Sequence, residues 1–171
     1  MSYAIVYDSR TGNTEALARV VAAALPSEGR LAFGRVDEVD RAAVAQADRV
    51  YAGFWTNRGD CGDELAEVLA SLADKDVFLF GTAGFGADET YFAGVMARVA
   101  VHLPESARIV GTFMCQGRMP ASVRARYAQT AEAKPEQAAR MHQLIENFDE
   151  AASHPDDDDL ARLREAVQAA S

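Results

Sequence analysis

The sequence predicts an α/β protein with a parallel sheet that carries helices on both faces. Short runs of β-branched and aromatic residues alternate with segments of helical periodicity through the first two thirds of the chain. One of these runs, VFLFGTA at residues 77–83, is almost entirely apolar, which is typical of a central strand buried on both faces. From about residue 117 the β pattern stops and the remaining chain has a helical pattern.

Five strands are expected from composition. Three stretches are rich in β-branched and aromatic residues: YAIVYD, RVYAGFW and ARIVGTFMC. RLAFGRV supplies the remaining strand. The expected strands are residues 3–8, 30–36, 49–55, 77–83 and 107–115.

Helices are expected between these strands. In the first, Leu17, Val21 and Leu25 share one face, and Pro26 with Ser27 ends the pattern. The segments after the third and fourth strands repeat apolar side chains at the same spacing. The expected connecting helices are residues 13–25, 61–73 and 89–103.

The last third of the chain is expected to be helical. Residues 136–152 repeat apolar side chains at helical spacing, as does the following PDDDDLARLREAVQAA, and another helix is expected near 119–131. The sequence has no repeats and no long flexible linker. We therefore expect a single domain over residues 1–171, with a core over about 1–133 and a helical extension over about 134–171 that packs against it.

The charge of the chain excludes some classes of partner. The sequence has 17 basic and 26 acidic residues and a formal net charge of −9. Nucleic acid is not an expected partner, because its phosphates require a basic patch. A partner with a basic surface would instead be attracted.

No membrane segment, disulfide framework or metal site is expected. No apolar run approaches the roughly 18 residues that suggest a membrane span, and the N-terminus lacks the pattern of a signal peptide, so we expect a cytoplasmic protein. Cys61 and Cys115 are too far apart for a thiolate metal site and are expected to act as small apolar residues. His102, His142 and His154 show no ligand spacing.

The stretch IVYDSRTGNT places hydroxyl and amide side chains directly after the first expected strand, where parallel α/β sheets bind ligands. Gly12 permits a tight turn, and the N–H groups of residues 10–14 converge as the next helix begins, which favours a phosphate. The loop has neither the lysine of a P-loop nor the glycine spacing of the dinucleotide fingerprint. An ordinary turn capped by Thr11 is the alternative. Further neutral donors come from Ser9, Thr11, Asn13 and Thr14.

These residues resemble the flavodoxin family. That family's phosphate-loop motif, S/T-x-T-G-N-T, falls at residues 9–14. GFWTNRGD at 53–60 and TAGFGADETYF at 82–92 fall where the family places its flavin contacts. The resemblance covers roughly residues 3–115. It implies FMN bound without a covalent link, in a flavodoxin-like, doubly wound, five-stranded parallel sheet of order 2-1-3-4-5.

The resemblance also implies which residues contact FMN. Trp55 and Phe85 are aromatic side chains able to stack on the flavin ring. Packing in the core is the alternative for Trp55, and packing at a helix start is the alternative for Phe85 and Tyr91. The expected cofactor-binding residues are Ser9, Arg10, Thr11, Gly12, Asn13 and Thr14 in the first loop, Trp55, Thr56, Asn57 and Gly59 in the second, and Thr82, Ala83, Gly84, Phe85, Gly86, Asp88 and Tyr91 in the third.

The second loop departs from the family pattern. Many flavodoxins have Gly-Asp directly after the aromatic residue, whereas this chain has Thr56, Asn57 and Arg58 before Gly59. A β-branched threonine resists a positive φ, so Asn57 or Gly59 is expected to adopt it. An acidic chain with few cations at the phosphate disfavours the added negative charge of fully reduced flavin. We therefore expect a low reduction potential for the second electron, an effect that cations at Arg10 and Arg58 would partly offset.

The C-terminal segment is the second departure. A short flavodoxin would end about one helix after its fifth strand, so one of the helices near 119–131 or 136–152 is expected to take that place and the other to be extra. FMCQGRMP at 113–120 resembles a flavodoxin-like sub-family with such an extension. Some members of that sub-family accompany tetrapyrrole reductases, bilirubin reductase among them.

Three functions remain open. The first is a monomeric electron carrier that passes low-potential electrons between a reductase and a redox partner protein, which docks through a basic surface of its own. The second is an FMN-dependent reductase of a small substrate, such as a quinone or tetrapyrrole, which the extra helices favour if they wall the flavin edge. The third is a flavin-free interaction module. No catalytic side chain is expected, because FMN carries the chemistry.

Overall fold

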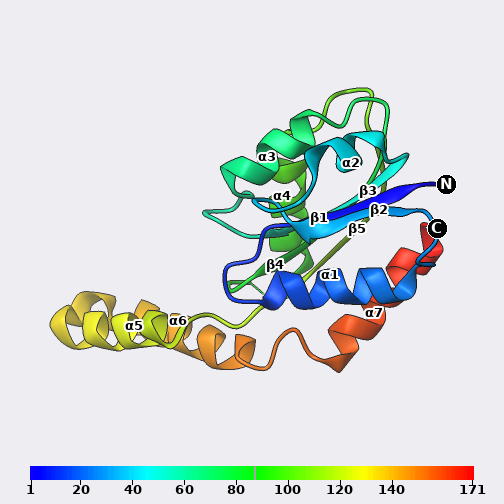
Figure 1. Cartoon of the computed structure of the whole chain (residues 1–171). Coiled ribbons are helices and arrows are strands. Elements are labelled where there is room, and N and C mark those ends of the chain that lie inside the picture. The colour runs from blue at the N-terminus through cyan, green and yellow to red at the C-terminus, as the bar shows by residue number, and fades with distance from the viewer. Residues whose placement is uncertain (87) are drawn as a thin grey trace.

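Five parallel strands form one sheet in the computed structural model, which describes residues 1–86 and 88–171 (Figure 1). The order is β2-β1-β3-β4-β5, and each neighbouring pair is parallel. The expected order 2-1-3-4-5 is confirmed. The strands are β1 (Tyr3–Tyr7), β2 (Arg30–Arg35), β3 (Arg49–Trp55), β4 (Asp76–Ala83) and β5 (Arg108–Gln116).

The expected helices are present within the described residues, most of them shorter than the sequence pattern suggested. A 3₁₀ turn, Pro135–Gln137, precedes the sixth helix. The α-helices are α1 (Asn13–Ala24), α2 (Arg41–Gln46), α3 (Asp63–Ala70), α4 (Glu89–Ala100), α5 (Ala121–Ala133), α6 (Ala138–Ala151) and α7 (Asp157–Ala169).

Helix α2 was not predicted from the sequence. Its six residues bury only Val44, so the helix is too short to show an apolar periodicity. Asp40 starts it, because its carboxylate accepts hydrogen bonds from the N–H groups of Ala42 at 2.9 Å and Ala43 at 3.3 Å. An aspartate before a run of alanines is the signal that could have indicated this helix.

The core lies in two layers, one on each face of the sheet. Val77 and Leu79 of β4 belong to the layer beneath α3 and α4, whereas Phe78 and Phe80 belong to the layer beneath α1 and α7. All four side chains are completely buried. The apolar run of β4 therefore forms a central strand covered on both faces, as the sequence predicted.

The extension expected over about residues 134–171 packs against the core through its last helix. Leu163 and Val167 of α7 are completely buried and pack in the same apolar cluster as Ile5 of β1 and Leu17 of α1. Helix α7 lies beside α1 on one face of the sheet (Figure 1). The last helix therefore completes the fold, and neither of the two helices expected near 119–131 and 136–152 takes that place.

Helices α5 and α6 form a hairpin, residues 121–151, inserted between β5 and α7. The hairpin projects away from the sheet (Figure 1), and α5 has no buried residue. A two-pronged ion pair between Arg124 and Asp149, at 2.7 and 3.0 Å, ties its two helices together. Among the described residues, no helix combines the length and apolar character that crossing a bilayer requires.

Candidate functional site

A cleft of about 680 Å³ lies at the carboxyl ends of β1, β3 and β4. Its walls come from the loops that follow these three strands and from a fourth segment, which runs from Gly117 into the first turns of α5. A larger groove of about 870 Å³ runs along β5 between α4 and α7, but none of the expected cofactor residues lines it. The cleft is therefore the candidate site.

Most of the expected cofactor residues meet in this cleft. Those that line it are Arg10, Thr11, Asn13, Trp55, Thr56, Gly59, Thr82, Ala83, Gly84, Phe85 and Tyr91. Those that the structure places outside its lining are Ser9, Gly12, Thr14, Asn57, Gly86 and Asp88.

The loop after β1 turns at Gly12 and leaves backbone donors free at the start of α1. Gly12 has a φ of +86°, in the region that favours glycine, and stands as the N-cap of α1. Ser9 is buried, and its hydroxyl accepts from the N–H of Glu15 at 3.2 Å. Ser9 rather than Thr11 therefore accepts from the first turn of α1, so the alternative cap by Thr11 is not formed. The N–H groups of residues 11–14 find no acceptor in the described part of the chain, as an anion site at a helix start requires.

Asn13 joins this loop to the segment after β5. Its amide nitrogen donates to the hydroxyl of Thr11 at 3.0 Å and to the carbonyl of Arg118 at 2.9 Å. A Cβ atom on Gly117 would lie 2.5 Å from the same nitrogen, so the close approach requires glycine. The side-chain amide oxygen of Asn13, Oδ1, is buried without a hydrogen-bond partner among the described residues.

Thr14 has a structural contact that the sequence did not reveal. Its side chain is completely buried, and its hydroxyl oxygen lies 3.0 Å from that of Thr82. This hydrogen bond ties the first turn of α1 to the end of β4. The hydroxyl of Thr14 therefore stabilises the floor of the cleft, whereas Thr82 also lines it.

The loop after β3 is a tight turn closed by backbone hydrogen bonds between Asn57 and Asp60, at 2.7 and 3.0 Å. Gly59 has a φ of +87°, as expected, but Arg58 rather than Asn57 is the second residue with a positive φ, at 52°. Thr56 donates its N–H to the carbonyl of Thr82 at 2.8 Å. The hydroxyl of Thr56 is buried in the cleft wall without a partner in the described residues.

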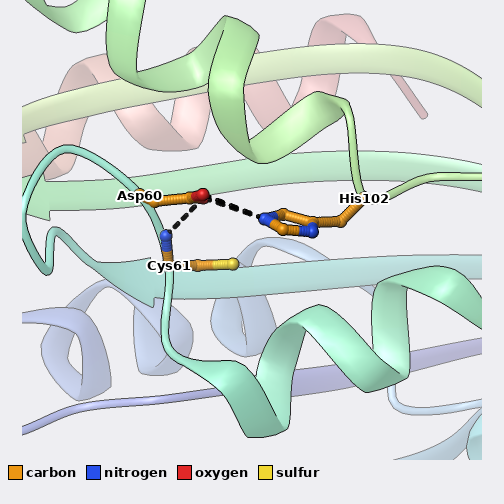
Figure 2. Close-up of side chains that lie close together, drawn as sticks. All are labelled: Asp60, Cys61 and His102. Atoms are coloured by element: carbon orange, nitrogen blue, oxygen red, sulfur yellow. Dashed lines mark hydrogen bonds and ion pairs between the residues drawn. The ribbon is translucent and has the colours of Figure 1, made fainter.

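Asp60, Cys61 and His102 meet behind this turn (Figure 2). The carboxylate of Asp60 accepts from the N–H of Cys61 at 2.8 Å and lies 3.1 Å from the His102 ring nitrogen. Burial alone would raise the pKa of Asp60, but the hydrogen bonds from Cys61 and His102 lower it below its ordinary value. The arrangement anchors the turn to the end of α4. Sequence spacing could not show it, because about forty residues separate His102 from the other two.

Neither cysteine is an activated nucleophile. Burial raises the pKa of the Cys61 thiol to about 12, with a further contribution from the Asp60 charge, and burial likewise raises that of Cys115. Both side chains are buried, which confirms that they act as small apolar residues.

Iodoacetamide at about pH 8 is expected to label neither cysteine of the folded protein. At a pKa of about 12, only about one thiol in ten thousand is ionised at that pH, roughly a thousandfold fewer than for a free cysteine. Mass spectrometry should show no adduct on the folded chain and both cysteines modified after unfolding in guanidinium. Rapid labelling of Cys61 in the folded chain would contradict the raised pKa.

The loop after β4 is held by a residue of the hairpin. Asn147 of α6 donates to the carbonyl of Gly84 at 2.9 Å, and its own side-chain oxygen accepts from the N–H of Gly86 at 3.3 Å. Phe85 is 52 % exposed and meets the edge of Tyr91 at a ring distance of 5.7 Å. Exposure at the cleft leaves the Phe85 ring free to contact a ligand.

Asp88 has a structural role at the end of this loop. Its carboxylate caps α4 by accepting from the N–H of Tyr91 at 2.7 Å. Ala87, within the expected segment 82–92, lies outside the described residues.

The fourth wall was missed by sequence reasoning. Met119, Pro120, Ser122 and Val123 line the cleft, and the side chain of Met119 lies against Gly84, where an added Cβ would stand 2.4 Å from it. The hairpin therefore begins at the cleft and covers one side of it. No turn or periodicity marks this role, because only the fold brings the end of β5 beside the loop after β4.

Comparison with known proteins identifies the family. A family model described as Flavodoxin domain matches residues 4–168. The chain belongs to the flavodoxin family. A relative in this family is 37% identical, with 96% of this chain and 93% of the relative aligned: the flavodoxin-like domain-containing protein BilS of Clostridium symbiosum (strain WAL-14163).

Solved structures show how widely the flavodoxin fold is shared. Oxidised flavodoxin 2 from Bacillus cereus has a TM-score of 0.55 at 17% identity, over 99% of this chain and 97% of that one. The apo form of an NADH:FMN oxidoreductase has a TM-score of 0.56 at 15% identity, over 99% of this chain and 87% of that one. Since the two neighbours differ in function, the fold by itself does not choose between carrier and reductase.

The cleft fits a flavin phosphate as the family implies. The free N–H groups at the start of α1 suit the phosphate, and Trp55 offers a half-buried aromatic face. The side chains of Thr11, Thr56 and Thr82 add polar groups to the lining of the same cleft. The donor set is therefore chemically suited to a flavin mononucleotide.

Proposed function

We propose that the chain binds FMN in this cleft and passes electrons in the cytoplasm between a reductase and a redox partner protein. Bound FMN supplies the redox chemistry by accepting and donating electrons. The protein supplies free N–H groups for the phosphate, aromatic faces for the ring and shielding from water. The observation that carries the proposal is the group of N–H donors at residues 11–14, which stand at the start of α1 beside the cleft and find no acceptor in the described chain.

Thr56→Val is expected to stabilise the protein and to leave FMN binding nearly unchanged. Valine keeps the shape of threonine while removing a hydroxyl that has lost water without gaining a partner, so the free energy of unfolding should rise by up to about 1 kcal/mol. The dissociation constant for FMN should change by less than about twofold, because the buried hydroxyl has no surface open to a ligand in the cleft. Urea unfolding of the apoprotein and a fluorescence titration with FMN measure the two effects.

Thr14→Val is the matched control, because it makes the same chemical change at a hydroxyl that is already paired with Thr82. Its free energy of unfolding should fall by roughly 1 kcal/mol. Opposite signs for the two variants separate a buried hydroxyl without a partner from one that is paired. Absence of FMN binding by the unmodified chain would refute the proposed function.

A reductase acting on a small substrate is the second candidate. The base of the hairpin favours it, because Met119 and Val123 wall one side of the cleft and can cover a substrate beside the flavin. Incubation of the reduced, FMN-loaded protein with a quinone, without any partner protein, tests this candidate. Fast reoxidation of the flavin, with one quinone reduced to hydroquinone per fully reduced flavin, supports the reductase, and slow reoxidation supports the carrier.

A further inference from the structure

The cleft has the opposite charge to the whole chain. Its lining contains five arginines and, among the described residues, no aspartate or glutamate. The complete sequence has 26 acidic residues against 17 basic ones. The five arginines come from three of the four walls and from α4. Arg10 follows β1, Arg58 follows β3, Arg118 and Arg126 belong to the fourth wall, and Arg98 lies on α4.

These five guanidinium groups keep their charge available. None lies within ion-pair distance of a carboxylate in the described chain. The arginines that do form ion pairs there lie outside the cleft lining: Arg19, Arg35, Arg49, Arg108, Arg124 and Arg162. Arg98 donates to the carbonyl of Gly59 at 2.6 Å, and Arg10 stacks 5.4 Å from the centre of the Trp55 ring. The adjacent carboxylate of Asp8 accepts from the indole N–H of Trp55 at 2.9 Å. Arg10 and Arg58, expected near the site from the sequence, are joined there by Arg98, Arg118 and Arg126.

One FMN phosphate does not account for this charge. A phosphate monoester carries about −1.5 to −2 and would offset about two of the five arginines. The remaining positive charge, about +3, surrounds the open side of the cleft. Arg58 lies in the loop after β3, Arg98 of α4 contacts that loop at Gly59, and Arg126 lies on α5, so the surplus comes from more than one wall.

We propose that the molecule exchanging electrons at this cleft is a small polyanion that carries two or more carboxylate or phosphate groups. The inference rests on the proposed FMN site and applies to the second candidate function, because the molecule that it names is a small substrate rather than a partner protein. At physiological salt a charge acts over about 8 Å, so a small anion inside the cleft meets the arginines before the acidic remainder of the chain. An acidic protein would span far more surface and meet that acidic remainder as well.

Salt dependence of flavin reoxidation with two small probes tests this proposal. The FMN-loaded protein is reduced with dithionite and mixed with hexacyanoferrate(III), a trianion, or with hexaammineruthenium(III), a trication. Each metal complex accepts one electron, so two ions reoxidise one fully reduced flavin, and the flavin protons pass to the solvent. Stopped-flow absorbance gives the rate as salt rises from about 20 mM to about 500 mM.

The rate with the trianion is expected to fall about fivefold or more across this range, and the rate with the trication is expected to rise. If the net charge of −9 alone decided the rates, salt would raise the rate with the trianion and lower the rate with the trication. The sign of the slope therefore decides between local and overall charge.

Arg126→Gln and Arg58→Gln are expected to flatten the slope with the trianion, and Arg164→Gln is the control. Arg164 is exposed on α7 and does not line the cleft, so its slope should match that of the unmodified protein. Equal slopes for the cleft variants and the control overturn the proposal. An unmodified protein whose rate with the trianion rises with salt does the same.

A second readout separates this proposal from the FMN site. Trp55 is the one tryptophan of the chain and lines the cleft, so its fluorescence reports on the cleft without any flavin. In the apoprotein at low salt, the ratio of iodide to caesium quenching should be at least about threefold higher than the same ratio for free N-acetyltryptophanamide. Failure to bind FMN refutes the proposed function, whereas a ratio equal to that of free N-acetyltryptophanamide refutes the anion preference.

Discussion

Replacing Asp159 with alanine is expected to lower the free energy of unfolding by about 2 to 3 kcal/mol. The loss is smaller than for a fully buried ion pair, because its partner Arg162 is largely exposed and solvent screens the interaction. Asp159 is 1% exposed and accepts from the N–H of Asp156 at 3.1 Å. His154 and Arg162 also pair with its carboxylate. The substitution removes one half of a capping box and leaves these donors without their acceptor.

The effect should reach the whole domain, because α7 completes one layer of the core through Leu163 and Val167. Urea denaturation followed by circular dichroism measures it. Asp158→Ala is the control, since Asp158 is exposed in the same helical turn and contributes mainly to the helix dipole, about 0.5 kcal/mol. Equal losses for the two variants would show that Asp159 acts only as another acidic residue of the first turn.

Most of the fold could be predicted because its signals are local. The apolar run at 77–83 is long enough to indicate a strand covered on both faces, and the motif at 9–14 marks the turn from β1 into α1. Asp156 caps α7, and Asp157, Asp158 and Asp159 stand in its first turn, where acidic side chains complement the helix dipole. The burial of Asp159 was not foreseen, because its partners depend on how α7 docks.

The role of each C-terminal helix could not be predicted from periodicity. Helices α6 and α7 both have an apolar stripe, but only the structure shows that Leu163 of α7 lies in the sheet core. Contacts between distant segments were hidden for the same reason. Asn147 holds the loop after β4 from 61 residues away, and His102 reaches Asp60 from 42 residues away.

The charge of the cleft also depends on the fold. Five arginines scattered from Arg10 to Arg126 show no cluster along the sequence, and the composition points to an acidic protein. Only the convergence of the loops after β1 and β3 with α4 and α5 concentrates them. Net charge therefore predicts attraction at long range, whereas the residues in contact with a ligand decide what the cleft binds.

Trp55→Ala is expected to weaken FMN binding by roughly 10- to 100-fold, since an aromatic side chain that stacks on a ligand contributes roughly 1 to 3 kcal/mol through buried area and ring geometry. Trp55 ends β3, lines the cleft and is only half-buried, so its ring face remains available. Titration of the variant with FMN, followed by flavin fluorescence, measures the change. The remaining bound flavin should also fluoresce more strongly, because the quenching indole is gone.

Trp55→Phe separates stacking from the hydrogen bond that Trp55 makes to Asp8. Phenylalanine keeps an aromatic face but removes the indole N–H that donates to Asp8 at 2.9 Å. If stacking dominates, the phenylalanine variant should bind FMN within about fivefold of the unmodified protein, and the alanine variant should not. Equal weakening in both variants would assign the effect to the Asp8 hydrogen bond, which orders the end of β3. Unchanged binding in both would place Trp55 in the core alone, and Phe85 would become the aromatic residue to test.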